Sequence, residues 1–136
     1  MSSQVRGLKV KKNPLDKILG KNKTWEIRST DTKFRGDIFL LQTKDNTATS
    51  GLVRGKAKIV KTIFLGTSDK PDELNARLYE TQSFHCMDKE DFQRTLKYRY
   101  VYAYVLEEVT VMTPLEYENP NGAVKWVRNV VLRGVT

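Results

Sequence analysis

Alternating hydrophobic and polar positions recur along most of the chain and predict more strands than helices. The longest such segment is rich in β-branched residues and contains Gly55, where we expect a bulge to bend the strand sharply. Bent strands of this kind are typical of small barrels. The predicted strands cover residues 5–10, 24–29, 38–42, 52–65 and 98–111, and a last hairpin turns at Asn121-Gly122 and returns through residues 123–127.

Short helical segments separate these strands. The first runs from Pro14 to Leu19 with Asn13 as its predicted N-cap, and it ends at Gly20. An acidic segment, 69–81, is compatible with a helix, and Asp88 is placed to cap another that passes through Phe92 and Leu96. The pattern therefore predicts an α+β fold, a small mixed β-barrel with short helices covering its ends.

A short polar motif at the start of the second predicted strand, GKNKTWEIR, gathers an amine, a carboxylate and a guanidinium. Glu26 and Arg28 are two residues apart and share one strand face, while Trp25 and Ile27 share the other. Lys23 enters from the preceding turn and can reach the polar face. Such a group can bind phosphate or a nucleobase edge, or hold an acid and a base for proton transfer. A simple surface ion pair between Glu26 and Arg28 is the alternative.

Length and composition favour one domain over residues 1–136, since 39% of the residues are hydrophobic and 29% are charged. No apolar run is long enough to cross a bilayer, and the first residues lack a secretory signal, so we expect a cytoplasmic protein. The single Cys86 cannot form an internal disulfide, and with the single His85 it cannot complete a zinc site. We expect His85 to bond the start of the following helix. No metal and no cofactor are predicted.

Positive charge is concentrated at the N-terminal end of the chain. The net charge is +8, and residues 1–36 carry ten Lys or Arg against three Asp or Glu, which leaves an excess of only one positive charge in the remaining hundred residues. A charge gradient of this kind favours an anionic partner that faces the segment, either a nucleic acid or a phosphorylated small molecule. A solvated basic surface without a partner is the alternative.

Four tyrosines fall at alternate positions in the segment 98–111, and they share one strand face. They form either a core stripe or an exposed platform on which bases stack. These residues are Tyr98, Tyr100, Tyr102 and Tyr104.

The order of these motifs resembles the ASCH (activating signal cointegrator homology) domains, which are relatives of the PUA-like barrels. The resemblance covers nearly the whole chain. It rests on a first strand, a Pro-initiated helix, a Gly-x-Lys-x-x-Glu-x-Arg motif, an Arg-Gly turn and an apolar strand in LKVKKNPLDKILGKNKTWEIRSTDTKFRGDIFLLQT, and on the later segments VRGKAKIV, DKEDF after His85, YAYVLE and PLEYENPNGAVKWV.

The resemblance implies a β-barrel whose cleft holds the motif residues Lys23, Glu26 and Arg28, and a role in RNA or nucleotide binding. Some relatives are amidohydrolases that deacylate acetylated cytidine, and others are ribonucleases. This chain departs from the motif in one place, because two residues instead of one separate Gly20 from Lys23. It also has Glu26 where the deacylating relatives place a threonine nucleophile, so that activity is not carried over.

The leading hypothesis is a module that binds RNA or a nucleotide, and single-stranded or structured RNA fits better than duplex DNA because no helix is long enough to read a major groove. Basic side chains would engage phosphates or base edges, Glu26 would accept from an exocyclic amine, and Tyr104 would offer a stacking face. The predicted binding residues are Lys23, Glu26, Arg28, Lys33, Arg35, Thr43, Lys44 and Tyr104.

Two alternatives stay open. In the first, the same cleft belongs to a metal-independent ribonuclease or a small amidohydrolase in which Lys23 is the base or nucleophile and Glu26 the acid/base or orienting group. In the second, the chain is a protein interaction module whose docking surface is the acidic region 69–90. For Arg35, next to Gly36, local packing in a turn is the alternative to ligand contact.

Overall fold

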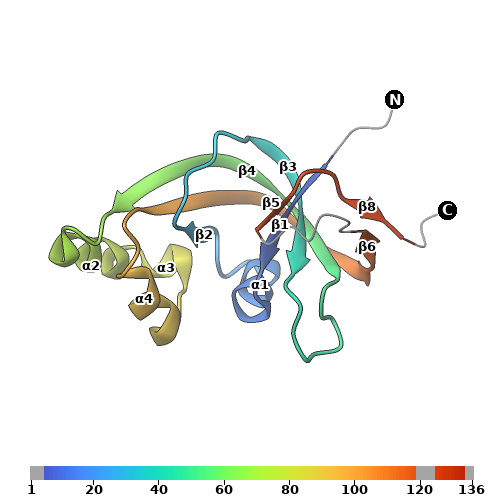
Figure 1. The fold of residues 1–136 in the computed structure, drawn as a ribbon, viewed down its shortest axis with the longest axis horizontal. Coiled ribbons are helices and arrows are strands. Elements are labelled where there is room, and N and C mark those ends of the chain that lie inside the picture. Colours follow the sequence, from blue (N-terminus) through green and yellow to red (C-terminus); the bar gives the residue numbers. More distant parts are fainter. Residues whose placement is uncertain (1–4, 119–124, 134–136) are drawn as a thin grey trace.

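The centre of the structure, a computed structural model that describes residues 5–118 and 125–133, is a curled six-stranded sheet (Figure 1). The strands follow the order β2-β5-β4-β3-β1-β7, and two further short strands form a separate pair, β6-β8. The strands are β1 (Arg6–Val10), β2 (Trp25–Arg28), β3 (Gly36–Gln42), β4 (Val53–Gly66), β5 (Val101–Leu115), β6 (Tyr117–Glu118), β7 (Trp126–Val127) and β8 (Val131–Leu132).

Four helices complete the described fold. All of them lie on the same side of the long strands β4 and β5, with α1 near β1 and the other three at the far end (Figure 1). Their bounds are α1 (Lys12–Leu19), α2 (Pro71–Glu80), α3 (Gln82–His85) and α4 (Lys89–Thr95). None of these helices is long and apolar enough to span a membrane.

The sheet is mixed, because β1 runs parallel to β3 while every other pairing in it is antiparallel. The curl brings β1 and β2 to face each other although three strands separate them in the sheet order. The result is a half-barrel with short helices, and the predicted α+β barrel architecture is confirmed. The predicted turn at Asn121-Gly122 lies outside the described residues.

Gly55 lets helix α1 pack against β4 where that strand bends. The pairing of β4 with β5 shifts register between Val53 and Gly55, so the predicted irregularity is present. A Cβ atom at Gly55 would lie 2.6 Å from Leu19 Cδ2 and 2.7 Å from the Thr110 carbonyl oxygen. Both distances are shorter than van der Waals contact, so only glycine fits between the helix and the strand without displacement.

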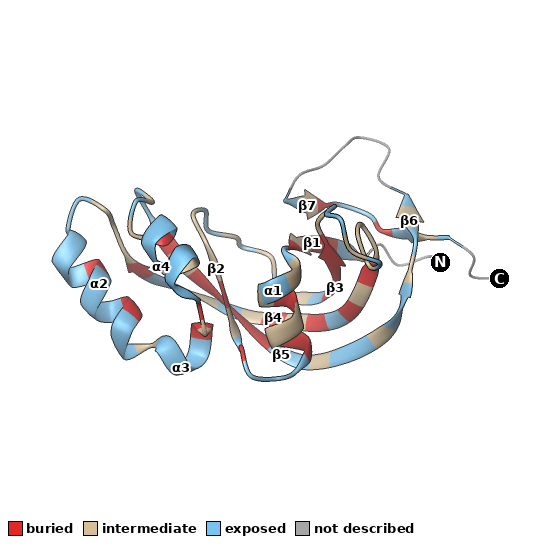
Figure 2. Cartoon of the chain, turned by 90° about the horizontal axis from the view of Figure 1, so that it is seen from below, coloured by how far each residue is buried: buried red, intermediate tan, exposed pale blue. Residues whose placement is uncertain are grey.

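The buried face of α1 fills the hollow of the sheet (Figure 2). Leu15 and Ile18 are fully buried there, with Leu19 at the edge. Burial of one such aliphatic side chain contributes about 1.5–3 kcal/mol, so this contact anchors the helix firmly. The cluster is completed by Leu8, Val10, Ile38, Leu40, Ala57, Ile59, Tyr104 and Leu106.

Helix α1 begins two residues earlier than predicted. Its N-cap is Lys11, which has an extended backbone and makes no side-chain cap, so the prediction that Asn13 is the N-cap is wrong. The first helical hydrogen bond runs from Leu15 N–H to the Lys11 carbonyl. Pro14 is tolerated inside the first turn because the N–H groups of that turn have no helical partner in any case.

The end of α1 explains how the chain accommodates the extra residue before Lys23. Lys21 has a φ of +63°, the Lys21 N–H bonds the Ile18 carbonyl, and the Asn22 N–H bonds the Lys17 carbonyl. This is the hydrogen-bond pattern of a Schellman motif, with Lys21 at the left-handed position that glycine usually fills. The motif reverses the chain at once, and Lys23 still reaches the interior.

Strand β5 begins later than predicted, so the four tyrosines do not share one face of it. Tyr98 is held in a turn, since its N–H bonds the Thr95 carbonyl and its carbonyl accepts from Ser68 N–H, and the strand starts only at Val101. Tyr102 and Tyr104 do belong to the strand and pack with the α1 cluster. The predicted cap of α4 is confirmed, because the Asp88 side chain accepts from the Asp91 N–H.

Replacement of Lys21 by glycine should stabilise the protein. A left-handed backbone costs an L-residue roughly 1–2 kcal/mol, and glycine avoids this cost. Glycine also gives the unfolded chain more conformational entropy, which offsets part of the gain, so we expect Lys21→Gly to raise the free energy of unfolding by about 0.5–1 kcal/mol. Urea denaturation followed by circular dichroism measures the change.

The control is Lys97→Gly, at another exposed lysine that is outside the positive-φ residues. It should leave the free energy of unfolding unchanged or lower it. Equal shifts for the two variants would contradict the account of the α1 terminus.

Candidate functional site

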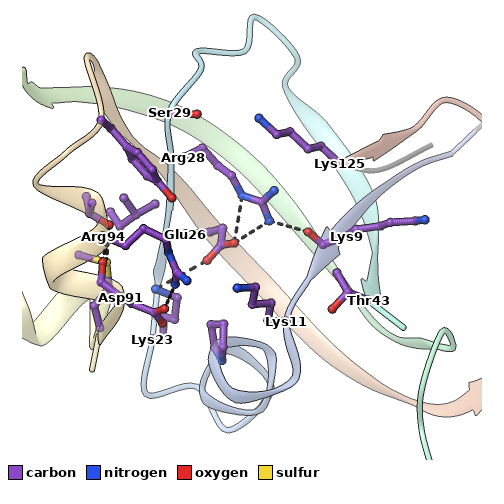
Figure 3. A pocket seen from close by; sticks show the side chains of 15 residues that line it. Lys9, Lys11, Lys23, Glu26, Arg28, Ser29, Thr43, Asp91, Arg94 and Lys125 are labelled. Atoms are coloured by element: carbon purple, nitrogen blue, oxygen red, sulfur yellow. Dashed lines mark hydrogen bonds and ion pairs between the residues drawn. The ribbon is translucent and has the colours of Figure 1, made fainter. Parts of the chain in front are cut away.

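A cleft of about 300 Å³ opens along the seam where β1 and β2 face each other (Figure 3). Its walls come from β1 and the residue after it, from the first turn of α1, from β2 and its flanks, and from the residue after β3. The segment around α4 and the residue before β7 complete them. The lining residues are Lys9, Lys11, Pro14, Lys23, Glu26, Ile27, Arg28, Ser29, Thr43, Met87, Asp91, Arg94, Thr95, Tyr98 and Lys125.

Arg28 closes the seam by bridging the two strands. Its Nη2 donates to the Lys9 carbonyl on β1 at 2.6 Å and to Glu26 Oε2 at 2.7 Å, and its Nε donates to the same carboxylate oxygen at 3.1 Å. The alternation of β2 points Glu26 and Arg28 to the same face, as predicted, because their cross-strand partners on β5 are Tyr104 and Tyr102.

Glu26 lies at the floor of the cleft, with 9% of its side chain exposed. Its Oε2 is taken by Arg28, whereas Oε1 is 3.7 Å from the Lys23 ammonium and accepts no hydrogen bond from any residue that the structure describes. One oxygen of this carboxylate therefore retains its capacity to accept a hydrogen bond from a ligand.

Lys23 is almost completely buried, with 2% of the residue exposed. Its ammonium donates to the His85 carbonyl at the end of α3, at 2.5 Å. Burial lowers the pKa of Lys23, and the nearby Glu26 carboxylate opposes that shift. The amine thus ties β2 to α3 and forms part of the cleft floor at the same time.

The turn after α3 presents two carbonyls to lysines. Cys86 has a left-handed backbone, with a φ of +51°, and its carbonyl accepts from Lys17 Nζ at 2.8 Å, next to the His85 carbonyl that accepts from Lys23. The His85 ring is fully buried. Its Nδ1 accepts from the Met87 N–H and its Nε2 donates to the Leu78 carbonyl, which fixes a neutral ring. His85 was predicted to bond the start of the following helix, and in the structure its partner is Met87, two residues before α4.

Helix α4 supplies the wall opposite β1. Asp91 and Arg94 both line the cleft and form an ion pair with each other. Tyr98 follows the helix and adds an aromatic ring to the lining. Both carboxylates of the cleft, those of Glu26 and Asp91, are therefore bonded to arginines.

Lysines contribute the remaining charge of the cleft. Lys11 and Lys125 are exposed, and neither ammonium has an ion pair within the described part of the chain. Lys9 lies between them, and its N–H donates to the Lys125 carbonyl. Six basic residues thus line the cleft against two acidic ones. A negative charge entering it meets ammonium groups before it meets a carboxylate.

The structure brings four of the predicted site residues together, since Lys23, Glu26, Arg28 and Thr43 all line the cleft. Lys44 lines a separate cavity instead. Tyr104 has no exposed surface, and its hydroxyl donates to the Thr30 carbonyl, so the ring has no free face for stacking.

Two basic residues of the predicted site lie in the loop between β2 and β3, outside the cleft lining. Arg35 donates to the carbonyls of Thr32 and Phe34 and to the Thr62 hydroxyl, which is the local turn role considered as the alternative. Lys33 is exposed.

Apart from Thr43, the cleft residues outside the motif were not among the predicted site residues. Lys9 and Lys11 precede α1, Asp91 and Arg94 lie three residues apart on α4, and Lys125 directly precedes β7. The alternation of β1 and the charge excess of the first 36 residues pointed at Lys9 and Lys11, but only the parallel pairing of β1 with β3 places them opposite β2.

A metal ligand set is not apparent at the cleft. No group of three or more His, Cys, Asp or Glu side chains with metal-binding geometry occurs within residues 5–118 and 125–133.

Comparisons with known proteins agree on one family. The sequence model described as the ASCH domain matches residues 8–125. Crystal structures of ASCH from Zymomonas mobilis share the fold. The first is 13% identical to this chain with a TM-score of 0.65, and the match covers 83% of this chain and 73% of the Zymomonas chain. A mutant of that protein is 14% identical with a TM-score of 0.67, and the match covers 92% of this chain and 89% of the mutant chain. No curated protein matches the sequence.

Acidification should destabilise the protein through His85. Burial, and then the neighbouring Lys23 charge, lower the pKa of His85 below its ordinary value of 6.5. Below pH 6.5 the unfolded chain therefore binds a proton that the folded protein refuses, and stability falls with pH until the folded pKa is reached, by at most about 1.4 kcal/mol per pH unit. Urea denaturation at pH values from 7.5 to 5 measures the slope.

The matched variant is His85→Gln, whose amide can still donate to the Leu78 carbonyl. Because the chain has one histidine, the variant should flatten the dependence over this range. The same slope in both proteins would show that another group is responsible.

Proposed function

The chain belongs to the ASCH domain family, and on that premise we propose that the cleft between β1 and β2 binds RNA or a nucleotide. The family has a PUA-like fold that is often linked to RNA binding. That residues 1–136 form one domain and that the protein acts in the cytoplasm stay predictions.

One observation carries this proposal. The cleft combines six basic residues with two carboxylates, and both carboxylates are bonded to arginines. The exposed ammonium groups of Lys11 and Lys125 stand at its rim. A phosphate that enters replaces water around two ammonium groups and meets no uncompensated acid, which is the arrangement that phosphate-binding surfaces use.

The floor of the cleft offers contacts that suit a base. Glu26 Oε1 is an acceptor for an exocyclic amine, and Ser29 and Thr43 add hydroxyl groups. Tyr98 takes the stacking role that sequence reasoning gave to Tyr104. The volume, about 300 Å³, lies at the lower end of the range for small-ligand sites and fits one nucleotide.

The shape of the site favours a single strand over a duplex. The longest described helix has 10 residues, and it lies on the far end of the sheet from β1. Contacts converge into a concave cleft, so a splayed base can enter it, whereas the stacked base pairs of a duplex cannot.

Binding of single-stranded RNA should weaken steeply with salt and depend on the rim lysines. For the double variant Lys11→Ala/Lys125→Ala we expect affinity at low salt to fall roughly tenfold, and the slope of log Kd against log salt to fall by about 1.4, which corresponds to two lost phosphate contacts. Fluorescence anisotropy with labelled RNA at several salt concentrations measures both quantities.

The matched control removes two exposed lysines that line neither cavity, as Lys61→Ala/Lys70→Ala. It should leave affinity and slope close to those of the unmodified protein. RNA binding that is independent of salt, or equal losses in the two double variants, would overturn the proposal.

An enzyme acting on RNA or modified nucleosides is the second candidate, and the geometry at Lys23 favours keeping it. The pKa of Lys23 is lowered by burial, and its Nζ lies 3.7 Å from Glu26 Oε1 at the cleft floor. An amine and a carboxylate so placed can exchange a proton with a substrate. To act as a base the ammonium must first lose a proton, and the neutral amine can still donate one of its remaining N–H groups to the His85 carbonyl.

The enzyme hypothesis predicts that Glu26→Gln lowers any product release from RNA or acylated nucleosides by about 100-fold or more, while the distant Glu80→Gln leaves it unchanged. Chromatographic separation of products from the purified proteins measures the rates. Full activity in Glu26→Gln would show that Glu26 takes no part in catalysis. If the unmodified protein releases no product, the enzyme hypothesis is wrong and only the binding function stands.

A further inference from the structure

A second cavity of about 280 Å³ lies next to the cleft and shares one residue with it. Lys9 lines both. The two residues that follow β3 are divided between them, because Thr43 lines the cleft and Lys44 lines the second cavity. The cleft and the cavity are therefore neighbours across Lys9 and Thr43.

The second cavity is basic. Its lining contains Lys9, Lys44 and Arg133 and no acidic residue, within the part of the chain that the structure describes. The single ion pair of Arg133 is a 4.0 Å contact with Glu118 in which both side chains are more than half exposed, so it neutralises little of the charge. Tyr117 adds an aromatic side chain to the same lining.

Lys9 and Lys44 repel each other. Burial, and after it the charge of Lys44, lower the pKa of Lys9, which is the sign expected for two ammonium groups held near each other. Figure 3 shows the Lys9 side chain extending away from the Glu26–Arg28 pair, while its carbonyl faces Arg28. A phosphate bound at this cavity would be attracted by both ammonium groups.

The side chain of Gln42, which also lines the cavity, has both its amide nitrogen and its carbonyl oxygen hydrogen-bonded. The buried Gln42 amide donates to Asp45 and Thr47, and its carbonyl accepts from Thr49 and Arg54. The loop between β3 and β4 is fixed by these bonds, and Lys44 is carried on it. The backbone that carries Lys44 beside the cavity is thus held in place by these bonds.

From these observations we propose that the ligand is a polynucleotide strand, with one nucleotide in the cleft and the phosphate of a neighbouring nucleotide in the second cavity, against Lys9, Lys44 and Arg133. The proposal rests on the proposed function of the cleft and narrows it to chains of two or more nucleotides. Cations beside an aromatic side chain are the usual combination for single-stranded nucleic acid.

The test compares a short and a long ligand. The probes are the four nucleoside 5′-monophosphates and the four RNA homohexamers, measured by isothermal titration calorimetry at low salt. We expect at least one hexamer to bind about tenfold or more tightly than its monophosphate. The double variant Lys44→Ala/Arg133→Ala should weaken that hexamer roughly tenfold and leave the monophosphate unchanged.

The control double variant, Lys61→Ala/Arg77→Ala, removes the same charges from exposed positions that line neither cavity. It should alter neither affinity. Thermal melting checks that each variant is folded.

The possible failures are distinguishable. If monophosphates bind but hexamers bind no more tightly, and Lys44→Ala/Arg133→Ala changes neither, the second cavity takes no part and the cleft function stands. If no nucleotide or hexamer binds the unmodified protein, both proposals fall. If a poly-glutamate peptide binds as tightly as the best hexamer and is weakened equally by the double variant, the cavity takes an acidic protein segment and the polynucleotide proposal is wrong.

Discussion

One side-chain bridge sets the geometry between two strands of the half-barrel that do not pair with each other. In the described part of the sheet, β2 pairs with β5 and β1 pairs with β3 and β7, so no backbone ladder joins β1 to β2. Arg28 spans the gap through the Lys9 carbonyl, and Glu26 holds its guanidinium in place. A buried ion pair of this kind costs desolvation energy and adds little net stability, but its geometry is fixed. Because the Arg28 side chain joins β1 to β2 where no backbone ladder does, space remains between the two strands. That space is the cleft.

Lys23 makes a second connection, on the opposite side of the cleft from β1. Its ammonium donates to the His85 carbonyl and so joins the segment before β2 to the end of α3, and Lys17 donates to the neighbouring Cys86 carbonyl. The polar floor of the cleft is therefore continuous from α3 to β1. A substitution that breaks one of these bonds removes a contact of the fold together with a group of the site, so the exposed rim lysines separate binding from folding more cleanly than the motif residues do.

Sequence reasoning could predict what is local and could not predict what the topology brings together. The alternation of WEIR was enough to place Glu26 and Arg28 on one face, and Asp88 was recognisable as a helix cap because its partner is three residues away. The alternation of tyrosines was equally compatible with an exposed stacking surface and with a core position for Tyr104. In the structure Tyr104 is buried in the cluster that contains residues of α1. Lys125 is more than a hundred residues from Lys9, and no periodicity links them.

The charge excess of the first 36 residues also has two meanings that only the structure separates. Lys12 bonds Asp16, Lys17 and Lys23 bond carbonyls, and Arg35 caps its own loop, so much of that positive charge holds the fold together. A count of charges treats these residues as equal to Lys11, whose ammonium faces the cleft. The electrostatic case for an anionic ligand rests on the few cations that line the two cavities. Four of these come from outside the basic segment, namely Lys44, Arg94, Lys125 and Arg133. Burial and hydrogen bonding, more than net charge, therefore decide which basic residues can meet a phosphate.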